Sequence, residues 1–241
     1  MELNIFQKGF NYSQDGPGNR LVYHLQGCNL RCPWCSNPEG LAHTGGTVYS
    51  IDELVEETQR SRMLFFDGGG VTLTGGEVTM QMEGAKAFLT RLREISVHTC
   101  IETNGISRQL PELFPVLDYL IMDIKHYDAT LHKDVTGLSN RQTVENIRAY
   151  LQTGGPLALR IPLIGGFNAS LEDARRFAEL LQMPGMEHAS VELLPYHEFG
   201  KDKYKQLNME YKMTGQARVS RAHVDAYADV LRQAGLKVIH T

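Results

Sequence analysis

The stretch LVYHLQGCNLRCPWC, residues 21–35, places three cysteines directly after an apolar run. Leu21 to Gln26 have the composition of a buried strand, and Cys28, Cys32 and Cys35 follow with the spacing C-x3-C-x2-C. Each iron of a four-iron, four-sulfide cluster needs one further ligand, and cysteine thiolate is the usual donor. Three thiolates on one loop could hold three irons and leave the fourth open to a small molecule.

Other uses of clustered cysteines stay open at this point. Three cysteines with a histidine or a fourth cysteine are also a common ligand set for structural zinc, and close thiols can be redox-active or form disulfide bonds. Zinc sites usually show two paired clusters, whereas the remaining cysteine, Cys100, lies far along the chain in an apolar stretch. The triplet therefore favours an iron–sulfur cluster, and we expect Cys100 to be a buried, inert thiol.

Composition and charge argue against several classes of function. The chain has 241 residues, 42% hydrophobic and 22% charged, which is typical of a soluble globular protein. A net charge of −4 argues against nucleic acid as the main partner. No run reaches the roughly 20 apolar residues of a membrane helix, and the N-terminus has no apolar signal-peptide core. Four cysteines, three of them clustered, do not resemble a secreted disulfide framework, so we expect a cytoplasmic protein.

From residue 20 onward, short apolar runs alternate with amphipathic patterns typical of helices. Ser50 and Glu53 have the spacing of a capping box, which predicts that a helix begins at Ile51. Apolar strands with intervening helices predict a parallel sheet covered by helices, here an α/β barrel or an incomplete one in a single domain, residues 1–241. The expected strands are 21–26, 70–74, 97–103, 119–124, 157–163 and 190–194, and the expected helices are 51–62, 80–95, 111–117, 143–152, 171–182 and 219–234.

Polar and glycine-rich motifs follow several of these strands at the point where each strand ends. In parallel α/β folds the carboxyl ends of the strands carry the active site, so we expect these motifs to meet at one rim. Loops collect glycine, asparagine and proline for other reasons too, but the cysteine loop is among the motifs. They are the cysteine loop, Gly75-Gly76-Glu77, Glu102-Thr103-Asn104-Gly105, Asp123-Ile124-Lys125 and Pro195-Tyr196-His197.

The cysteine spacing, with Trp34 between the last two cysteines, resembles the radical S-adenosylmethionine (SAM) superfamily. Thr74-Gly75-Gly76-Glu77 is similar to the SAM-binding motif of that superfamily. Further motifs are similar, in order and spacing, to the glycyl radical enzyme activating enzymes, above all those of pyruvate formate-lyase, over nearly the whole chain. These motifs are Asp15-Gly16-Pro17-Gly18, residues 68–77, Glu102-Thr103-Asn104-Gly105, Met122-Asp123-Ile124-Lys125 and residues 193–201.

The resemblance implies an incomplete (β/α)6 barrel with one [4Fe–4S] cluster that binds SAM at its open iron. An electron from the reduced cluster would break SAM into methionine and a 5′-deoxyadenosyl radical. That radical would take a hydrogen atom from the Cα of one glycine in a partner, a glycyl radical enzyme. A flavodoxin or ferredoxin is the expected electron donor, and the resemblance suggests a monomer that is active only without oxygen.

The resemblance also implies roles for individual residues. Cys28, Cys32 and Cys35 would ligate the cluster, and Gly75 and Gly76 would bind the methionine amino group of SAM. The partner's glycyl loop would contact Asp15 and Gly16, for which turn stabilisation is the alternative. The remaining residues expected to contact SAM, or a monovalent cation beside it, are Trp34, Asn37, Glu77, Glu102, Thr103, Asp123, Lys125, Arg160 and His197.

Several of these residues could instead have a purely structural role. Glu102 stands where the pyruvate formate-lyase activators have an aspartate, which adds a methylene to the expected cation site. Trp34 could simply pack within its loop, Glu77 could be a buried structural acid, and His197 could be an ordinary hydrogen-bonded side chain. Lys125 and Arg160 could balance the charge of Asp123.

The motifs leave several classes of partner open: a formate-lyase, a dehydratase, a C–N or C–S lyase, or another glycyl radical enzyme. Many activators of other glycyl radical enzymes carry a cysteine-rich insertion with further clusters, whereas residues 36–50 contain no cysteine. We therefore expect one cluster and no insertion, although residues 32–39 are more similar to activators that carry it. Two other classes of function stay open: a radical SAM enzyme that acts on a small molecule, and a zinc or iron–sulfur binding module.

Overall fold

The computed structural model describes residues 1–239. These residues form two compact units. The first unit comprises residues 1–29 and 39–121, and the second comprises residues 30–38 and those from 122 onward. The cysteine loop contributes to both, because Cys28 belongs to the first unit and Cys32 and Cys35 belong to the second. Among the described residues, no helix is long and apolar enough to cross a membrane.

The first unit is built on a sheet with the strand order β3-β1-β2-β4-β5-β6. Its centre is parallel, with Leu21 of β2 opposite Val71 of β4 and Val71 opposite Thr99 of β5. Buried apolar side chains run along these strands, which confirms the expected parallel sheet. The strands are β1 (Glu2–Tyr12), β2 (Asn19–Leu25), β3 (Thr47–Ser50), β4 (Gly70–Gly75), β5 (His98–Thr103) and β6 (Tyr119–Asp123), which crosses into the second unit.

Two antiparallel strands at one edge were missed by the sequence prediction. β1 pairs antiparallel with both β2 and β3. Along the first part of β1, Leu3 and Ile5 are buried, whereas Glu2 is exposed and Asn4 and Phe6 are only half-buried. This alternation is the pattern of a strand with one solvated face, which differs from the continuous apolar run of a central parallel strand.

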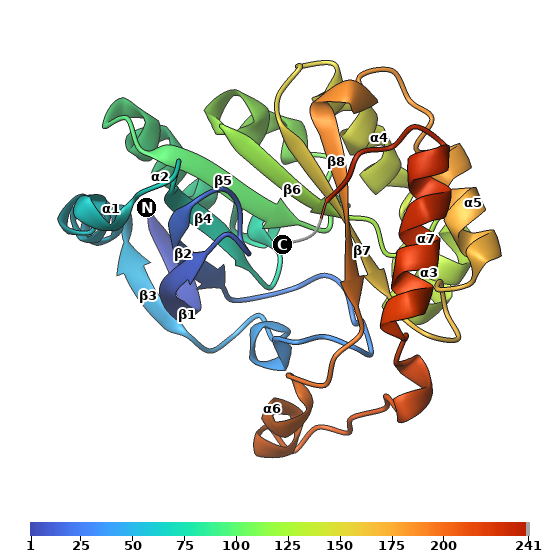
Figure 1. The fold of residues 1–241 in the computed structure, drawn as a ribbon. Helices are drawn as coiled ribbons and strands as arrows, with labels where there is room; N and C mark the ends of the chain where they lie inside the picture. The colour runs from blue at the N-terminus through green and yellow to red at the C-terminus, as the bar shows by residue number, and fades with distance from the viewer. Residues whose placement is uncertain (240–241) are drawn as a thin grey trace. The chain divides into compact units, whose positions relative to one another are not determined.

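Helices α1 and α2 belong to the first unit and contact each other (Figure 1). The capping box before α1 is confirmed: Ser50 Oγ accepts from the Glu53 amide at 3.2 Å, and the Glu53 carboxylate accepts from the Ser50 amide at 2.7 Å. Tyr23 of β2 meets Phe88 of α2 edge-on, with ring centroids 5.6 Å apart. The helical segments are α1 (Ile51–Arg60), α2 (Met82–Glu94) and the 3-10 turns η1 (Pro38–Gly40), η2 (Arg62–Leu64), η3 (Val78–Gln81) and η4 (Leu110–Val116).

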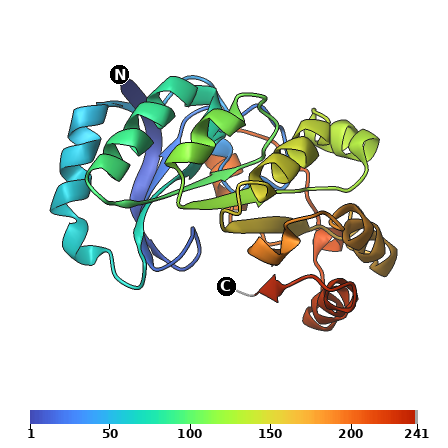
Figure 2. The ribbon, with the colours of Figure 1, turned by 90° about the horizontal axis from the view of Figure 1, so that it is seen from above.

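In the second unit the strand order is β6-β7-β8-β9, and β7, β8 and β9 run parallel. Helices α5 and α7 lie side by side (Figures 1 and 2), and Phe177 of α5 and Tyr227 of α7 are both fully buried. The elements are β7 (Leu157–Leu163), β8 (Ala189–Pro195), β9 (Val238–Ile239), α3 (Ala129–Thr136), α4 (Arg141–Leu151), α5 (Leu171–Leu180), α6 (Lys201–Gln206), α7 (Arg221–Gln233), η5 (Met186–His188) and η6 (Gly215–Ala217).

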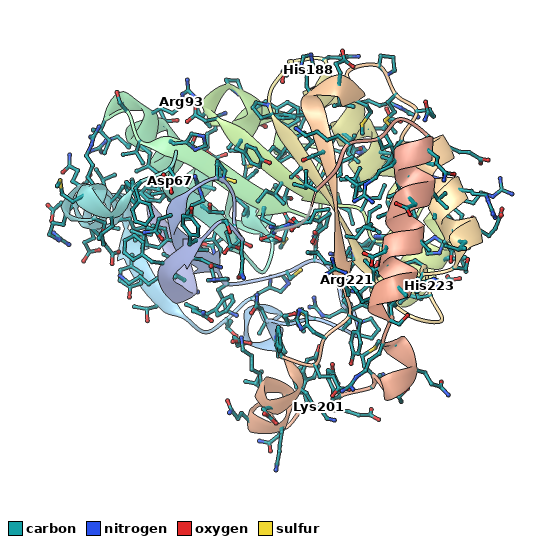
Figure 3. All side chains as sticks on the ribbon, in the orientation of Figure 1. Asp67, Arg93, His188, Lys201, Arg221 and His223 are labelled. Atoms are coloured by element: carbon teal, nitrogen blue, oxygen red, sulfur yellow. The ribbon has the colours of Figure 1, made fainter. Side chains whose placement is uncertain are left out.

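Two short helices of this unit were also missed. The Asp128 carboxylate caps α3 by accepting from the amides of Thr130 and Leu131, and α3 ends at Gly137 with φ of 100°. Lys201, marked in Figure 3, is the first residue of α6. Across residues 1–239 the strand order has two ends, β3 and β9, so the sheet is open, as expected for an incomplete α/β barrel.

Candidate functional site

The cysteine loop has no helix or strand over residues 26–37. All four cysteines of the chain are thiols; Cys28 is buried, and Cys32 and Cys35 are half-buried. Among residues 1–239, no group of three or more histidine, cysteine, aspartate or glutamate side chains is arranged to hold a metal ion. The donor chemistry nonetheless fits an iron–sulfur cluster, since three thiols follow one another closely on an irregular loop. A closed zinc site would need a fourth ligand.

In the first unit, the Gly75-Gly76 turn packs against the chain's own backbone. The Gly76 amide donates to the Leu25 carbonyl at 2.8 Å, and the Glu77 amide donates to the Gly27 carbonyl at 2.8 Å. A Cβ on Gly76 would lie 2.1 Å from the Gly27 oxygen, and Gly75 has φ of +111°. Both positions therefore require glycine, because the end of β4 lies directly against the start of the cysteine loop.

Glu77 is a buried acid that joins the ends of β4 and β5. It is 1% exposed. Its Oε1 accepts from the Thr103 hydroxyl at 2.6 Å and from the Thr79 hydroxyl at 2.7 Å, and its Oε2 accepts from the Asn104 amide at 2.8 Å. These donors belong to the protein, so the geometry favours the structural role for Glu77 and gives the Thr103 hydroxyl the same task.

We expect Glu77→Gln to lower the free energy of unfolding by about 2–3 kcal/mol. The NH2 group of the glutamine would replace one carboxylate oxygen, so a donor that now has an acceptor would lose it. Urea unfolding of the two proteins measures this difference. Glu83→Gln, on the exposed face of α2, is the matched control and should change stability by less than about 0.5 kcal/mol. Equal effects at the two positions would contradict the structural role of Glu77.

Two asparagines link the end of β5 to the cysteine loop, and the sequence prediction assigned a role to neither. The Asn104 side-chain amide donates to Asn29 Oδ1 at 2.7 Å, and the Cys28 thiol lies 4.0 Å from the same oxygen. The only signal in the sequence is the E-T-N-G motif, whose first two residues alone were expected to contact a ligand. Within the first unit, the expected meeting of the cysteine loop with the Gly-Gly-Glu and E-T-N-G motifs is therefore confirmed.

Glu102 lies on β5 beside β4. Its Oε2 accepts from the Thr74 hydroxyl at 2.9 Å. The carboxylate is thus fixed at the carboxyl end of the parallel strands. A monovalent cation beside it stays a prediction.

In the second unit, Asp123 and Lys125 form an ion pair of 2.7 Å just after β6. This pairing is the charge balance considered for Lys125. Asn168, which is fully buried, donates to the carbonyls of Lys125 and Pro162 at 2.8 and 2.7 Å. Asn168 therefore fixes the backbone that carries Lys125, a role that no motif indicated.

Arg160 of β7 pairs with Glu192 of β8. The two residues are register partners, and Arg160 Nε lies 2.7 Å from Glu192 Oε2 with both side chains almost fully buried. The second oxygen of Glu192 is buried and has no hydrogen-bond partner in the described residues. An acceptor left in this state is costly unless a further donor reaches it.

The later part of the cysteine loop packs within the second unit. Trp34 contacts Phe167 with ring centroids 5.1 Å apart, as part of a small apolar cluster with Ile164. This is the loop-packing role for Trp34; contact with adenine stays a prediction. Asn37 Oδ1 accepts from Lys203 Nζ at 3.1 Å, so α6 holds this end of the loop.

Tyr204 of α6 is buried close to the cysteine loop. Burial, with smaller contributions from the charges of Cys35 and Cys32, raises the pKa of Tyr204 to about 12. A Cβ on Gly200, just before α6, would lie 2.7 Å from the Cys35 carbonyl oxygen. The loop and the start of α6 are therefore in backbone contact.

His197 lies on the surface after β8. Its ring stacks on Phe199 with centroids 4.1 Å apart, and its Nδ1 accepts from the Phe199 amide at 3.3 Å. Desolvation lowers the pKa of His197 below its ordinary value. The contact of this ring with a nucleoside stays a prediction.

Asp15 and Gly16 form the turn between β1 and β2. Asn11 Nδ2 donates to the Asp15 carboxylate at 2.5 Å, and the Thr72 hydroxyl donates to the Asp15 carbonyl at 2.6 Å. Gly16 has φ of +119°. The turn stabilisation considered for these residues is thus present; contact with a partner stays a prediction.

A parallel α/β sheet with clustered thiols and a Gly-Gly turn where its strands end is typical of metalloenzymes that bind a small cofactor. The sequence profile of the radical SAM superfamily matches residues 22–180. The pyruvate formate-lyase 1-activating enzyme of Escherichia coli (strain K12) is 31% identical, over 93% of each chain. The choline trimethylamine-lyase activating enzyme of Oleidesulfovibrio alaskensis is 30% identical, over 91% of each chain.

A solved domain of the pyruvate-formate lyase-activating enzyme from Bacteroides vulgatus has the same fold, with a TM-score of 0.58 and 26% identity. The match covers 72% of this chain and 99% of that domain. The chain belongs to the radical SAM superfamily and, within it, to the glycyl radical enzyme activating enzymes. A [4Fe–4S] cluster and SAM are therefore its cofactors.

Proposed function

We propose that this enzyme activates a glycyl radical enzyme by removing a hydrogen atom from the Cα of one glycine. The observation that carries the proposal is the hydrogen-bonded junction of the cysteine loop with two strand ends, through Gly27, Asn29, Glu77 and Asn104, in a chain of this family. Cys28, Cys32 and Cys35 would hold the cluster. Once bound there and reduced, the cluster would supply the electron for the reductive cleavage of SAM.

The chain's own residues have three tasks in this proposal. Gly75 and Gly76 leave the backbone at the end of β4 open to the methionine part of SAM. The buried cations Lys125 and Arg160, oriented by Asp123 and Glu192, are suited to its carboxylate. The remaining proposed contacts are Trp34 and His197 with the nucleoside, Asn37 and Thr103 with SAM, Glu102 with a monovalent cation, and Asp15 and Gly16 with the partner's glycyl loop.

One cluster and no cysteine-rich insertion are part of the proposal. The alignment with the choline trimethylamine-lyase activating enzyme spans 284 positions, more than the 241 residues of this chain. That relative therefore carries residues without a counterpart here, whereas the alignment with the pyruvate formate-lyase 1-activating enzyme spans 230. With one cluster, the electron comes from outside, and we propose a flavodoxin or ferredoxin as donor to a cytoplasmic monomer active without oxygen.

The test combines two spectroscopic steps under anaerobic conditions. The enzyme is reconstituted with iron and sulfide and reduced with dithionite, and electron paramagnetic resonance (EPR) is recorded with and without SAM. We expect a [4Fe–4S] signal that changes when SAM is added. A signal that is indifferent to SAM would contradict the proposal.

The second step adds pyruvate formate-lyase or choline trimethylamine-lyase, each labelled with deuterium at glycine. We expect a glycyl radical signal in one of them and deuterium in the 5′-deoxyadenosine that forms. SAM cleavage without deuterium transfer from either protein would instead favour a small-molecule substrate.

A further inference from the structure

Arg20 is a fully buried arginine that the proposed chemistry does not use. It lies on β2, and its side chain connects three segments of the first unit. Nε donates to the Thr72 hydroxyl at 2.6 Å, Nη2 donates to the Val71 carbonyl at 2.6 Å, and Nη1 donates to the Pro17 carbonyl at 3.0 Å. The remaining contacts, at 3.3 Å, are with His98 of β5.

The hydrogen-bond acceptors of this guanidinium are neutral throughout the described residues: two side chains and three backbone carbonyls. Burying a charge without an opposite charge in contact costs free energy. Desolvation accordingly lowers the pKa of Arg20, against smaller opposing effects of Cys100 and Asp15. An apolar side chain at this position would be cheaper to bury. The presence of a guanidinium with these hydrogen bonds therefore requires an explanation.

The Asp15–Gly18 turn lies directly on this group. A Cβ on Gly16 would be 3.0 Å from Arg20 Cδ and 3.3 Å from Cys100 Sγ. The Thr72 hydroxyl accepts from Arg20 and donates to the Asp15 carbonyl. This single hydroxyl therefore connects the arginine to the backbone of the turn. At the base of the turn, the Ser13 amide donates to the Gly18 carbonyl at 3.0 Å.

The loop that follows η2 supports the other side of the turn. The Asn19 amide donates to the Phe66 carbonyl at 3.1 Å, and a Cβ on Gly18 would be 2.4 Å from that oxygen. The Tyr12 hydroxyl donates to Asp67, marked in Figure 3, at 3.0 Å. The turn is therefore fixed from below by Arg20 and Thr72 and from the side by this loop.

We propose that Arg20, acting through Thr72, is a positioning residue that holds the Asp15–Gly18 turn in the conformation that receives the partner's glycyl backbone. The inference rests on the proposed function and on the expected contact of the partner's glycyl loop with Asp15 and Gly16. The Asp15 carboxylate can accept hydrogen bonds from exposed amides of that loop. A main-chain ligand has no side chain to anchor it, so its capture depends on a receptor turn that is already ordered.

The first test measures the turn itself. Hydrogen exchange followed by mass spectrometry compares the reconstituted wild type with Thr72→Val, which keeps the shape but removes the hydroxyl, and with Thr72→Ser, which keeps the hydroxyl. We expect faster exchange over residues 11–19 in Thr72→Val, near wild-type exchange in Thr72→Ser, and unchanged exchange in α2 for both. Equal exchange over residues 11–19 in all three proteins, or faster exchange throughout Thr72→Val, would overturn the proposal.

The second test separates recognition from chemistry, with Arg20→Lys as a further variant. The acceptor is whichever of the two lyases forms a glycyl radical with the wild type. With it, we expect Thr72→Val and Arg20→Lys to lower kcat/KM for glycyl radical formation by about 10- to 100-fold, mainly through KM. SAM cleavage with dithionite and no acceptor should stay within about twofold of wild type. A parallel loss of both activities would show a merely structural role.

The two tests also distinguish this inference from the proposed function. A wild type that cleaves SAM but never forms a glycyl radical would remove the function proposed for the turn and, with it, the positioning role. The exchange measurement would still report whether the Thr72 hydroxyl orders the turn.

Discussion

Cys28→Ala is expected to abolish SAM cleavage, with 5′-deoxyadenosine formation falling by more than about 100-fold. This exceeds the 10- to 100-fold effect of losing a group that only supports a metal ligand, since the change removes one of three thiolate donors themselves. Iron content should fall in the same preparation. Product analysis by chromatography and EPR of the dithionite-reduced protein measure the two effects.

Cys100→Ala is the control for this experiment. Cys100 is fully buried and lies in β5, a strand of the parallel sheet, whereas Cys28 lies on a loop. We expect it to lose a little stability, as a buried small side chain does, and to keep the iron content and SAM-dependent signal of the wild type. Unimpaired SAM cleavage by Cys28→Ala would contradict the cluster assignment and, with it, the proposed function.

Gly76→Ala has the second large expected effect. The added Cβ would lie 2.1 Å from the Gly27 oxygen and 2.8 Å from the Gly40 oxygen, and neither backbone atom can move away as a flexible side chain would. We expect a loss of about 3 kcal/mol in the free energy of unfolding, at the upper end for overpacked sites. Urea unfolding measures the loss, and titration with SAM should show weaker binding.

Gly9→Ala provides the matched control, because an added Cβ there meets no atom within 4 Å. Gly9 lies in β1, where alanine should be neutral or stabilising by up to about 1 kcal/mol, since glycine loses more backbone freedom on folding. If Gly76→Ala were as well tolerated as Gly9→Ala, the close approach of β4 to the cysteine loop would be contradicted.

Local signals predicted much of the fold. β7 has the expected bounds, Leu157–Leu163, where a short apolar segment interrupted only by Arg160 matches a buried strand of a parallel sheet. α1 begins where Ser50 and Glu53 indicate. β1 was missed because an alternating N-terminal segment is a strand only when other strands pair with it. The expected helix at residues 111–117 is instead the 3-10 turn η4, which contains Pro115.

The chemical identity of the site was also largely in the sequence. Thiol spacing, the Gly-Gly-Glu turn and the order of the motifs led to the family, because metal ligation and close backbone approach need particular residue types at particular separations. Supporting residues such as Asn104, Asn168 and Glu192 gave no comparable signal. An asparagine or glutamate becomes a positioning group only through the partner that folding brings to it.

By itself, the sequence determined the cofactor chemistry, the strand ends that carry it and the helix that Ser50 begins, since each depends on residue type and short separation. Only the tertiary structure decided that Glu77 binds Thr103 and Asn104, that Arg160 pairs with Glu192, and that Arg20 lies beneath the Asp15 turn. Such contacts join residues that are mostly tens of positions apart. Their existence depends on strand register and burial, which the packing of the whole sheet sets.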